Sequence, residues 1–217
     1  MNRNQELRTK NLMKNQNESF PFTGIEVSSL TPENLERVCD AAERFNIGAI
    51  AHMTGEWEKH QLLDHTEWGV PPVDEEARRY MATLQHHIRR TSEYVTSRGL
   101  DFYIWRRELR LPVGFIEKYG PAWVDFANPE VWDLVRWNLN QIFDLFPRVK
   151  GLVLTCTGEE KPGEWITADG VASDQPLADR FEKMFRTVKE ECDRRGKMSI
   201  FRNHGVGALG VRLDGGD

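Results

Sequence analysis

Short apolar segments alternate with long amphipathic segments along this chain, and this alternation limits the folds that it can adopt. The apolar segments cover residues 23–27, 47–52, 100–105, 151–155 and 198–201, lengths that suit β-strands. The longer segments between them repeat apolar residues at the spacing of a helix that buries one face. Strand and helix repeated in this order predict parallel strands joined by right-handed helical crossovers.

Four helices are predicted, and their ends carry clear signals. The first begins at Thr31-Pro32-Glu33, which combines an N-cap, a first-turn proline and an acid that suits the helix dipole. Its predicted buried stripe ends at Phe45. The other three helices cover about 74–99, 128–146 and 174–196. In the second of them, His86-His87 is expected on a solvated face.

The strands are widely spaced, which predicts long loops on one side of the sheet. Four of them start at 47, 100, 151 and 197, about 50 residues apart, whereas a minimal unit needs roughly 30 residues. The extra residues fall mainly after the strands, as in the functional face of a barrel. We therefore predict an α/β fold, a partial (β/α)8 TIM-type barrel of about five strands and four helices. A five-stranded open sheet is the alternative.

The predicted domain organisation is simple. Residues 1–20 are rich in Asn, Gln, Lys and Arg and are expected to form a flexible arm. Residues 21–205 form the partial barrel domain, and residues 206–217 a glycine-rich tail. Since a closed barrel needs eight strands, the chain reads as a fragment, as one half of a homodimer, or as a barrel with a missing C-terminal half.

Composition limits the classes of partner. The 217 residues are 39% hydrophobic and 29% charged, which is typical of a globular protein. The net charge of −5 is mild and lysine and arginine form no stripe, so nucleic acid is not expected as a partner. The chain shows neither a signal peptide nor a segment of transmembrane length, and no membrane partner is expected. Its cysteines, Cys39, Cys156 and Cys192, are far apart and predict buried, reduced thiols in a cytoplasmic protein.

The strand at 151–155 runs into an acidic pair, Glu159-Glu160. In (β/α) barrels the chemistry lies at the C-terminal ends of the strands, so Glu159 has the position of a catalytic carboxylate. A glycosidase needs a protonated carboxylic acid to assist the leaving oxygen, and Glu159 fits that role if its surroundings are dry enough to raise its pKa. Glu160, next to it, is a candidate for substrate binding. The simpler interpretation is that both glutamates open a solvated loop.

Other strand ends also carry polar side chains. Arg106 and Arg107 suit bidentate binding of a substrate carboxylate, although such arginines equally often form structural ion pairs. His52, Asn203 and His204 are candidates for hydrogen bonds to sugar hydroxyls, against a structural role that is slightly favoured for the histidines.

Tryptophans follow the strands as well. An indole offers a flat apolar face and an N–H donor, which suits a sugar ring, and we single out Trp57, Trp105 and Trp165 for substrate binding. Trp68 and Trp123 also fall at or after strand ends. The alternative for any one of these rings is packing of a loop onto the barrel.

A metal site is a weaker hypothesis. His52, Glu159 and His204 together would suit zinc or manganese, but their spacing forms no short ligand motif. The leading interpretation therefore includes no metal and no cofactor.

The segment Phe146-Pro-Arg-Val-Lys-Gly-Leu-Val-Leu-Thr-Cys-Thr-Gly-Glu159 resembles the fourth strand of glycoside hydrolase (β/α)8 barrels, especially of the alpha-glucuronidase kind. Tyr103-Ile-Trp-Arg-Arg107 and the helix start at Asn128 look like the third unit of such barrels, and the similar layout spans about residues 22–205. The resemblance implies a carbohydrate substrate, with those that contain uronic acid included, and Glu159 as general acid. In related retaining barrels the nucleophile comes from a later strand, often the seventh, for which this chain offers no candidate.

The leading hypothesis is a glycoside-hydrolase-like protein that acts on or binds carbohydrate, with weak or no hydrolysis by this chain alone because the second carboxylate is missing. A non-catalytic carbohydrate-binding module that uses its tryptophans is one alternative. A metal-dependent sugar isomerase or lyase is the other.

Overall fold

The computed structural model of this protein describes residues 23–27, 30–53, 62–69, 72, 74–107, 127–156 and 176–203. In this part of the chain all strands lie in one sheet, where every neighbouring pair is parallel and the order follows the sequence. The strands are β1 (Gly24–Val27), β2 (Ala49–Met53), β3 (Asp101–Arg107), β4 (Gly151–Cys156) and β5 (Met198–Asn203). The predicted parallel strands with crossovers are confirmed.

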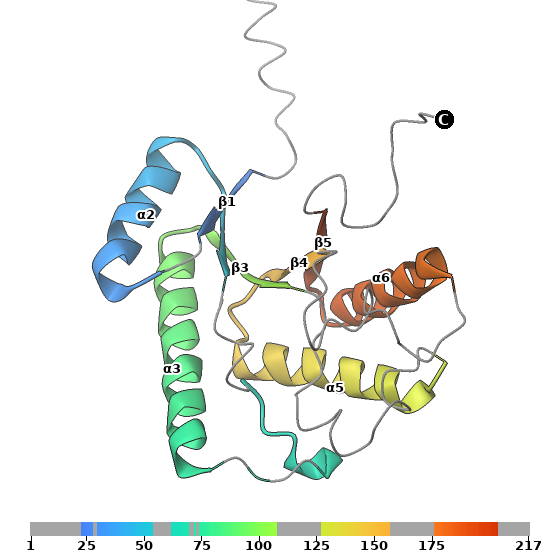
Figure 1. Ribbon diagram of the computed structural model, residues 1–217. Coiled ribbons are helices and arrows are strands. Elements are labelled where there is room, and N and C mark those ends of the chain that lie inside the picture. Colours follow the sequence, from blue (N-terminus) through green and yellow to red (C-terminus); the bar gives the residue numbers. More distant parts are fainter. Residues whose placement is uncertain are drawn as a thin grey trace, which may run out of the picture.

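The helices lie along one side of this sheet (Figure 1). They are α2 (Pro32–Arg44), α3 (Glu75–Ser97), α5 (Pro129–Leu145) and α6 (Leu177–Arg194), with a short 3-10 helix, η1 (Thr66–Trp68), before α3. Consecutive parallel strands with helices on a single side are the arrangement found in a (β/α)8 barrel, which closes with eight strands. The five described strands therefore form a partial TIM-type barrel, as the sequence predicts.

The starts of α2, α3 and α5 follow the expected capping chemistry. At α2 the Thr31 backbone N–H donates to Asn34 Oδ1 at 2.8 Å, and Pro32 occupies the first turn. At α3 Asp74 Oδ1 accepts from the Ala77 N–H at 2.8 Å, and at α5 Asn128 Oδ1 accepts from the Glu130 N–H at 3.0 Å. These side chains satisfy N–H groups that have no partner inside the helix.

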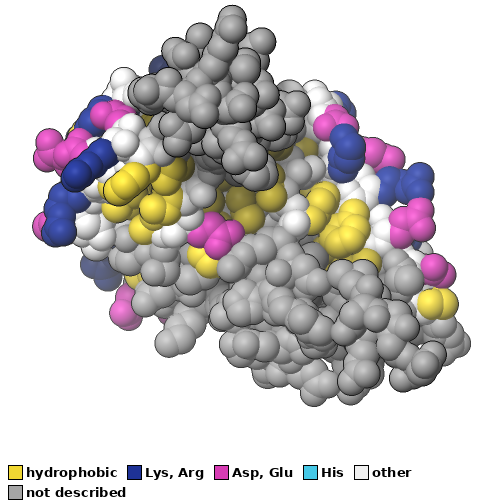
Figure 2. Space-filling view, turned by 90° about the horizontal axis from the view of Figure 1, so that it is seen from above, with side chains coloured by type: hydrophobic (Ala, Val, Ile, Leu, Met, Phe, Trp, Pro, Cys, Tyr) yellow, Lys and Arg dark blue, Asp and Glu magenta, His cyan; other side chains and the backbone are white. Residues whose placement is uncertain are grey.

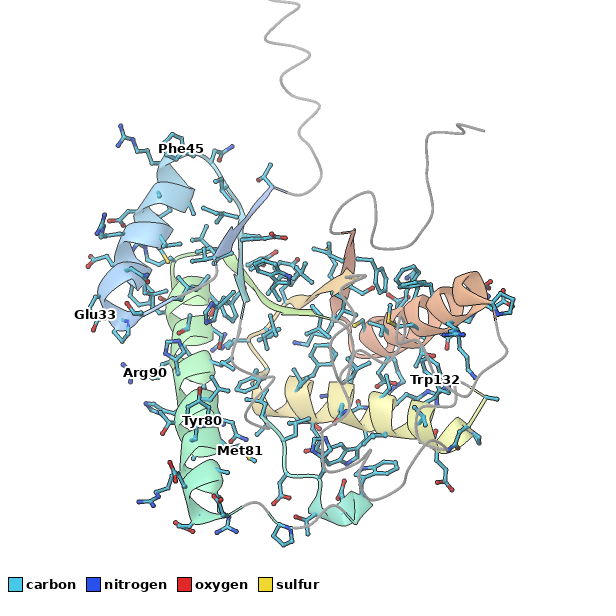
Figure 3. All side chains as sticks on the ribbon, in the orientation of Figure 1. Glu33, Phe45, Tyr80, Met81, Arg90 and Trp132 are labelled. Carbon is cyan, nitrogen blue, oxygen red and sulfur yellow. The ribbon has the colours of Figure 1, made fainter. Side chains whose placement is uncertain are left out.

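The predicted burial of Phe45 is wrong. Phe45 follows the last residue of α2, and 69% of its surface is exposed, where the sequence predicts burial. Figure 3 shows its ring at the outer end of the helix, away from the sheet. The helical spacing stops predicting the buried face there because the backbone leaves the helix at this residue.

The two faces of the sheet carry different cores. The large core between the sheet and the helices includes Ile50, Phe102, Ile104, Leu152 and Leu154. A separate cluster lies on the opposite face, which we call the inner face because it corresponds to the inside of a barrel. Its buried members are Ala49, Ala51, Tyr103 and Val153. The alternation of side chains along a strand explains this division.

Neighbouring helices are tied together near the starts of the strands. The Arg98 guanidinium, just after α3, contacts Asp40 at 2.8 Å and Glu43 at 2.7 Å, both on α2. Arg194 on α6 donates to Asn140 Oδ1 on α5 at 2.7 Å. The carboxylates that Arg98 contacts are largely exposed, so each of these ion pairs contributes little energy.

The segment before α3 docks into the helix layer. His65 and Asn138 are buried, and His65 Nε2 lies 2.7 Å from Asn138 Oδ1 on α5. Gln85 on α3 donates to the Leu62 carbonyl at 2.8 Å, and the Trp68 ring packs edge-on against Trp137 at 6.2 Å. Residues 62–69 therefore hold α3 and α5 together.

Two of the three thiols are buried in the helix layer, as predicted. Cys39 on α2 and Cys192 on α6 are both free and inaccessible, and burial raises the pKa of the Cys192 thiol to about 12. The side chain of Cys156 lies outside the described residues. None of the helices that the structure describes is long and apolar enough to cross a membrane.

Candidate functional site

The structure describes only part of the predicted site. The side chains of His52 and Trp105 are described, and for Arg106, Arg107 and Asn203 the backbone alone is described. The remaining predicted site residues lie outside the described residues: Trp57, Glu159, Glu160, Trp165 and His204. The roles given to these residues stay predictions.

The backbone brings three of the predicted strand ends together. Arg107 of β3 pairs in register with Thr155 of β4, and Asn203 of β5 pairs with Cys156, the last residue of β4. Arg107 and Asn203 therefore flank the end of β4 from its two sides. Glu159 follows this end by three positions in the sequence.

His52 lies on the face of the sheet that the helices cover. It shares this face with Ile50, two residues earlier, and its ring packs edge-on against His87 of α3, with 5.9 Å between the ring centres. His87 was predicted on a solvated face, and this contact corrects that prediction. Trp105 lies on the inner face, so His52 and Trp105 do not share a binding surface.

Burial keeps the His52 ring neutral. The side chain is 6% exposed, and desolvation lowers its pKa from 6.5 to about 4. Its Nδ1 lies 3.4 Å from the Val27 carbonyl oxygen on β1. Since a carbonyl can only accept, the proton of the neutral ring belongs on Nδ1. His52 thus links the ends of β1 and β2.

The Trp105 ring is half-buried on the inner face. It packs against the cluster of Ala49, Ala51, Tyr103 and Val153, and Ile200 packs there too. The Tyr103 hydroxyl donates to Met198 Sδ at 3.5 Å, and burial raises the pKa of this phenol to about 12. Tyr103 is therefore neutral at physiological pH, and Trp105 offers a partly exposed indole above an apolar floor.

A hollow of about 530 Å³ lies on the inner face. Its lining is drawn from β1, β2, β4 and β5: Gly24, Ile25, Glu26, Ala51, Val153, Ile200 and Phe201. Seen from above, hydrophobic side chains gather in the middle of the molecule with an acidic one among them, and most charged side chains lie around the rim (Figure 2). This volume falls within the range of about 300–1,000 Å³ typical of small-ligand sites.

Glu26 lines this hollow, although it belongs to no sequence motif that predicts a site. The signal was present in the alternation of β1, where Ile25 and Val27 are apolar and Glu26 stands between them. Both apolar residues pack against the helix-side core, which leaves Glu26 for the inner face.

Metal-binding chemistry finds no support in the part of the chain that is described. No group of three or more His, Cys, Asp or Glu side chains within those ranges is arranged to hold a metal ion. Two members of the proposed set, Glu159 and His204, lie outside those ranges, so the metal hypothesis stays untested.

No family model and no curated protein matches the sequence. Similar solved structures come from glycoside hydrolases. The tandem GH20 catalytic modules of a pneumococcal exo-β-D-N-acetylglucosaminidase match with a TM-score of 0.52 and 13% identity over 83% of this chain and 53% of that one. The α-galactosidase from Lactobacillus brevis matches with a TM-score of 0.50 and 14% identity over 88% of this chain and 28% of that one.

A third similar structure is a GH138 enzyme that targets pectin rhamnogalacturonan II, with a TM-score of 0.50 and 12% identity over 82% of this chain and 22% of that one. This chain thus spans from about a fifth to about half of the length of these three proteins. At such low identity the likeness shows the fold, which is that of glycoside hydrolase TIM barrels. The narrower resemblance to alpha-glucuronidases stays a prediction.

Proposed function

We propose that this chain is part of a glycoside-hydrolase-like protein that acts on or binds carbohydrate, with Glu159 as the general acid. The observation that carries the proposal is the register at the end of β4, where Arg107 and Asn203 flank the strand that leads to Glu159. Barrel enzymes place their chemistry at this end of their strands.

The other predicted residues have roles in binding. Arg106 and Arg107 would hold a substrate carboxylate, as in a uronic acid, through paired N–H donors. Asn203 and His204 would hydrogen-bond sugar hydroxyls, and Trp57, Trp105 and Trp165 would stack on sugar rings. His52 is also predicted to hydrogen-bond a sugar hydroxyl, although its ring is buried on the helix side, beside the Val27 carbonyl. The second carboxylate of a glycosidase has no assigned position, so we expect weak or no hydrolysis by this chain alone.

The test is the substitution Glu159→Gln, which keeps the size of the side chain and removes its acidic proton. Any hydrolysis of oligosaccharides, whose leaving sugar oxygen needs a proton, should fall at least about a hundredfold, as expected for loss of a general acid. Glu36→Gln on the exposed surface of α2 is the matched control, because it removes the same charge outside the predicted site. Equal turnover by the Glu159→Gln variant and the parent chain would remove Glu159 from the mechanism.

A non-catalytic carbohydrate-binding role is the second candidate, and the half-buried Trp105 ring beside the inner-face cluster favours it. Under this alternative, sugars change the tryptophan fluorescence of the chain and no product appears on chromatography. A Trp105→Ala variant should then lose the fluorescence response, while Trp137→Phe on α5 should keep it.

A further inference from the structure

Residues 62–69 belong to the long connection between β2 and α3, and they are held by both helices beside them. Leu62 is buried in the helix-side core, and its carbonyl accepts a hydrogen bond from Gln85 of α3 at 2.8 Å. His65 reaches α5, where its Nε2 lies 2.7 Å from Asn138 Oδ1. Segment 62–69 therefore has one hydrogen bond to each of the two helices in addition to its apolar contacts.

The hydrogen bond between His65 and Asn138 is shielded from water. The two residues are 5% and 8% exposed. An amide oxygen only accepts, so the His65 Nε2–H is the donor. A buried donor that loses its acceptor is costly, so removal of Asn138 Oδ1 would disfavour the docked position of the segment. The His65 ring also packs against Trp137 of α5, with 5.2 Å between the ring centres.

The docked segment shortens the part of the chain that carries Trp57. The described structure holds the chain at Met53, where β2 ends, and then at Leu62, which leaves the eight positions 54–61 between them. Without docking of segment 62–69, the next fixed point would be Asp74, the N-cap of α3, which leaves the twenty positions 54–73. Because the entropy cost of closing a loop grows with its length, the shorter stretch places Trp57 at a lower cost.

We propose that Asn138, acting through His65, is a positioning residue for carbohydrate binding. It holds segment 62–69 in the helix layer and thereby keeps Trp57 near the C-terminal end of β2, where this indole would stack on a sugar ring. The proposal rests on the proposed function, in which Trp57 binds sugar. Closing a loop of twenty positions instead of eight is disfavoured about fourfold, so undocking should weaken sugar binding about fourfold.

Fluorine NMR of the full chain labelled with fluorotryptophan tests this proposal without any need for hydrolysis. Trp68 and Trp137 pack against each other, so their two signals report docking of segment 62–69, and we call them the docking signals. The Trp57 signal reports the predicted site. Trp132 is buried on α5 beside Lys183 of α6, and its signal reports the rest of the fold. Each signal is assigned by replacing one tryptophan with phenylalanine.

Asn138→Leu is the decisive variant, because it keeps the size of the side chain and removes the acceptor. The docking signals and the Trp57 signal should move, while the Trp132 signal should keep its place. Asn138→Asp restores an acceptor oxygen, and it should return these signals to their positions in the parent chain. Such a rescue is expected of a positioning residue that works through this one hydrogen bond.

A second variant and a matched control make the result independent of any general damage to α5. Gln85→Leu removes the hydrogen bond that α3 makes to the segment, and it should also move the Trp57 signal. If Asn138→Leu fails to fold, Gln85→Leu decides the question. Asn140→Leu is the control, because it removes an amide of the same helix that binds Arg194 of α6 and leaves segment 62–69 in place.

Sugar binding is measured on the same samples. N-acetylglucosamine, galactose and glucuronate are titrated while the Trp57 signal is followed. A sugar that shifts this signal in the parent chain should bind Asn138→Leu about fourfold more weakly. It should bind Asn138→Asp and Asn140→Leu as it binds the parent chain.

Three results would overturn the proposal: docking signals that move in Asn138→Leu while Trp57 stays in place, Asn138→Asp failing to restore the parent signals, and sugars that bind Asn138→Leu and the parent chain equally well. In the last case sugar binding stands and only the positioning role is wrong. If no sugar shifts Trp57 in the parent chain although its signal depends on Asn138, the placement of Trp57 is right and its proposed role in binding these sugars is wrong.

Discussion

At the scale of single residues, His52 is a buried histidine whose protonated form would be destabilised by loss of contact with water. The ring is buried between β2 and α3, with the Val27 carbonyl and His87 as its neighbours. Its folded-state pKa of about 4 lies below the ordinary value of 6.5, so between these two values the unfolded chain binds more protons than the folded one. Protonation therefore favours unfolding as the pH falls through this window.

The expected size of this effect can be stated. His52 lowers the free energy of unfolding by about 3 kcal/mol once the pH is below 4, and has no effect above pH 7. His52→Asn should remove this dependence, since an asparagine amide keeps a donor near Val27 and does not titrate. The measurement is the free energy of urea unfolding of parent and variant from pH 7.5 to 4. Parallel curves for the two proteins would contradict the prediction.

A matched control shows whether the acid dependence of unfolding comes from His52 or from any histidine. His86, on α3, is exposed and lies beside the His87 that contacts the buried ring. His86→Gln should leave the acid dependence of the parent chain unchanged. Carboxylates that titrate in the same range affect parent and variants alike, so the difference between the curves isolates the imidazole.

At the scale of elements, the pairing of β4 with β5 depends on a glycine. A Cβ placed on Gly151 would lie 1.9 Å from the Met198 carbonyl oxygen, so the two strands would have to move apart. Gly151→Ala should destabilise the fold by about 1–3 kcal/mol, the usual range for overpacking. The change is measured as a shift of the midpoint in urea unfolding.

Gly48→Ala provides the control for this substitution. Its added Cβ would have the Thr23 carbonyl oxygen as its nearest neighbour, at 3.8 Å, which is ordinary contact. Both variants gain the same methyl group and lose the same backbone freedom in the unfolded state. A Gly151→Ala midpoint no lower than that of Gly48→Ala would show that β4 and β5 tolerate the side chain.

The sequence predicts the elements better than it predicts the faces of the strands. Caps such as Thr31, Asp74 and Asn128 mark helix starts through local hydrogen bonds, so their prediction needs no tertiary information. The face that His52 occupies depends on the parity of its strand, which a shift of one residue reverses. That parity follows from packing against α3 and the rest of the core, which the local pattern of a five-residue segment cannot specify.

The sequence likewise predicts one part of the candidate site and not the other. The register that brings Arg107 and Asn203 beside the end of β4 follows from parallel pairing of neighbouring strands, which the alternation of strands and helices predicts. The hollow does not follow from any local motif. It arises because small residues, such as Gly24 and Ala51, face the apolar Val153 and Ile200 from other strands of the sheet.

At the scale of the whole molecule, the two edge strands of the sheet, β1 and β5, differ in where they carry charge. Among the described strands β1 and β5 each have one neighbour, so the outer side of each pairs with no other described strand. Glu26 places a charge on β1, and charged edge strands resist pairing with other chains. β5 has its one charged residue, Arg202, near its end, so residues 198–201 carry no charge, and Met198 is 42% exposed. We therefore expect β5, and not β1, to drive self-association of this chain.

Light scattering across a range of protein concentrations tests this expectation. The mass of the parent chain should rise with concentration, and Met198→Lys should hold it near that of a monomer because a charged side chain then stands at the edge of β5. Phe45→Lys is the matched control, since it also replaces an exposed apolar side chain, 69% exposed, but at the far end of α2. Association lost equally in both variants would mean that general hydrophobicity drives it. A parent chain that stays monomeric at every concentration would show that the edge of β5 is covered, and the argument from unpaired backbone would then fail.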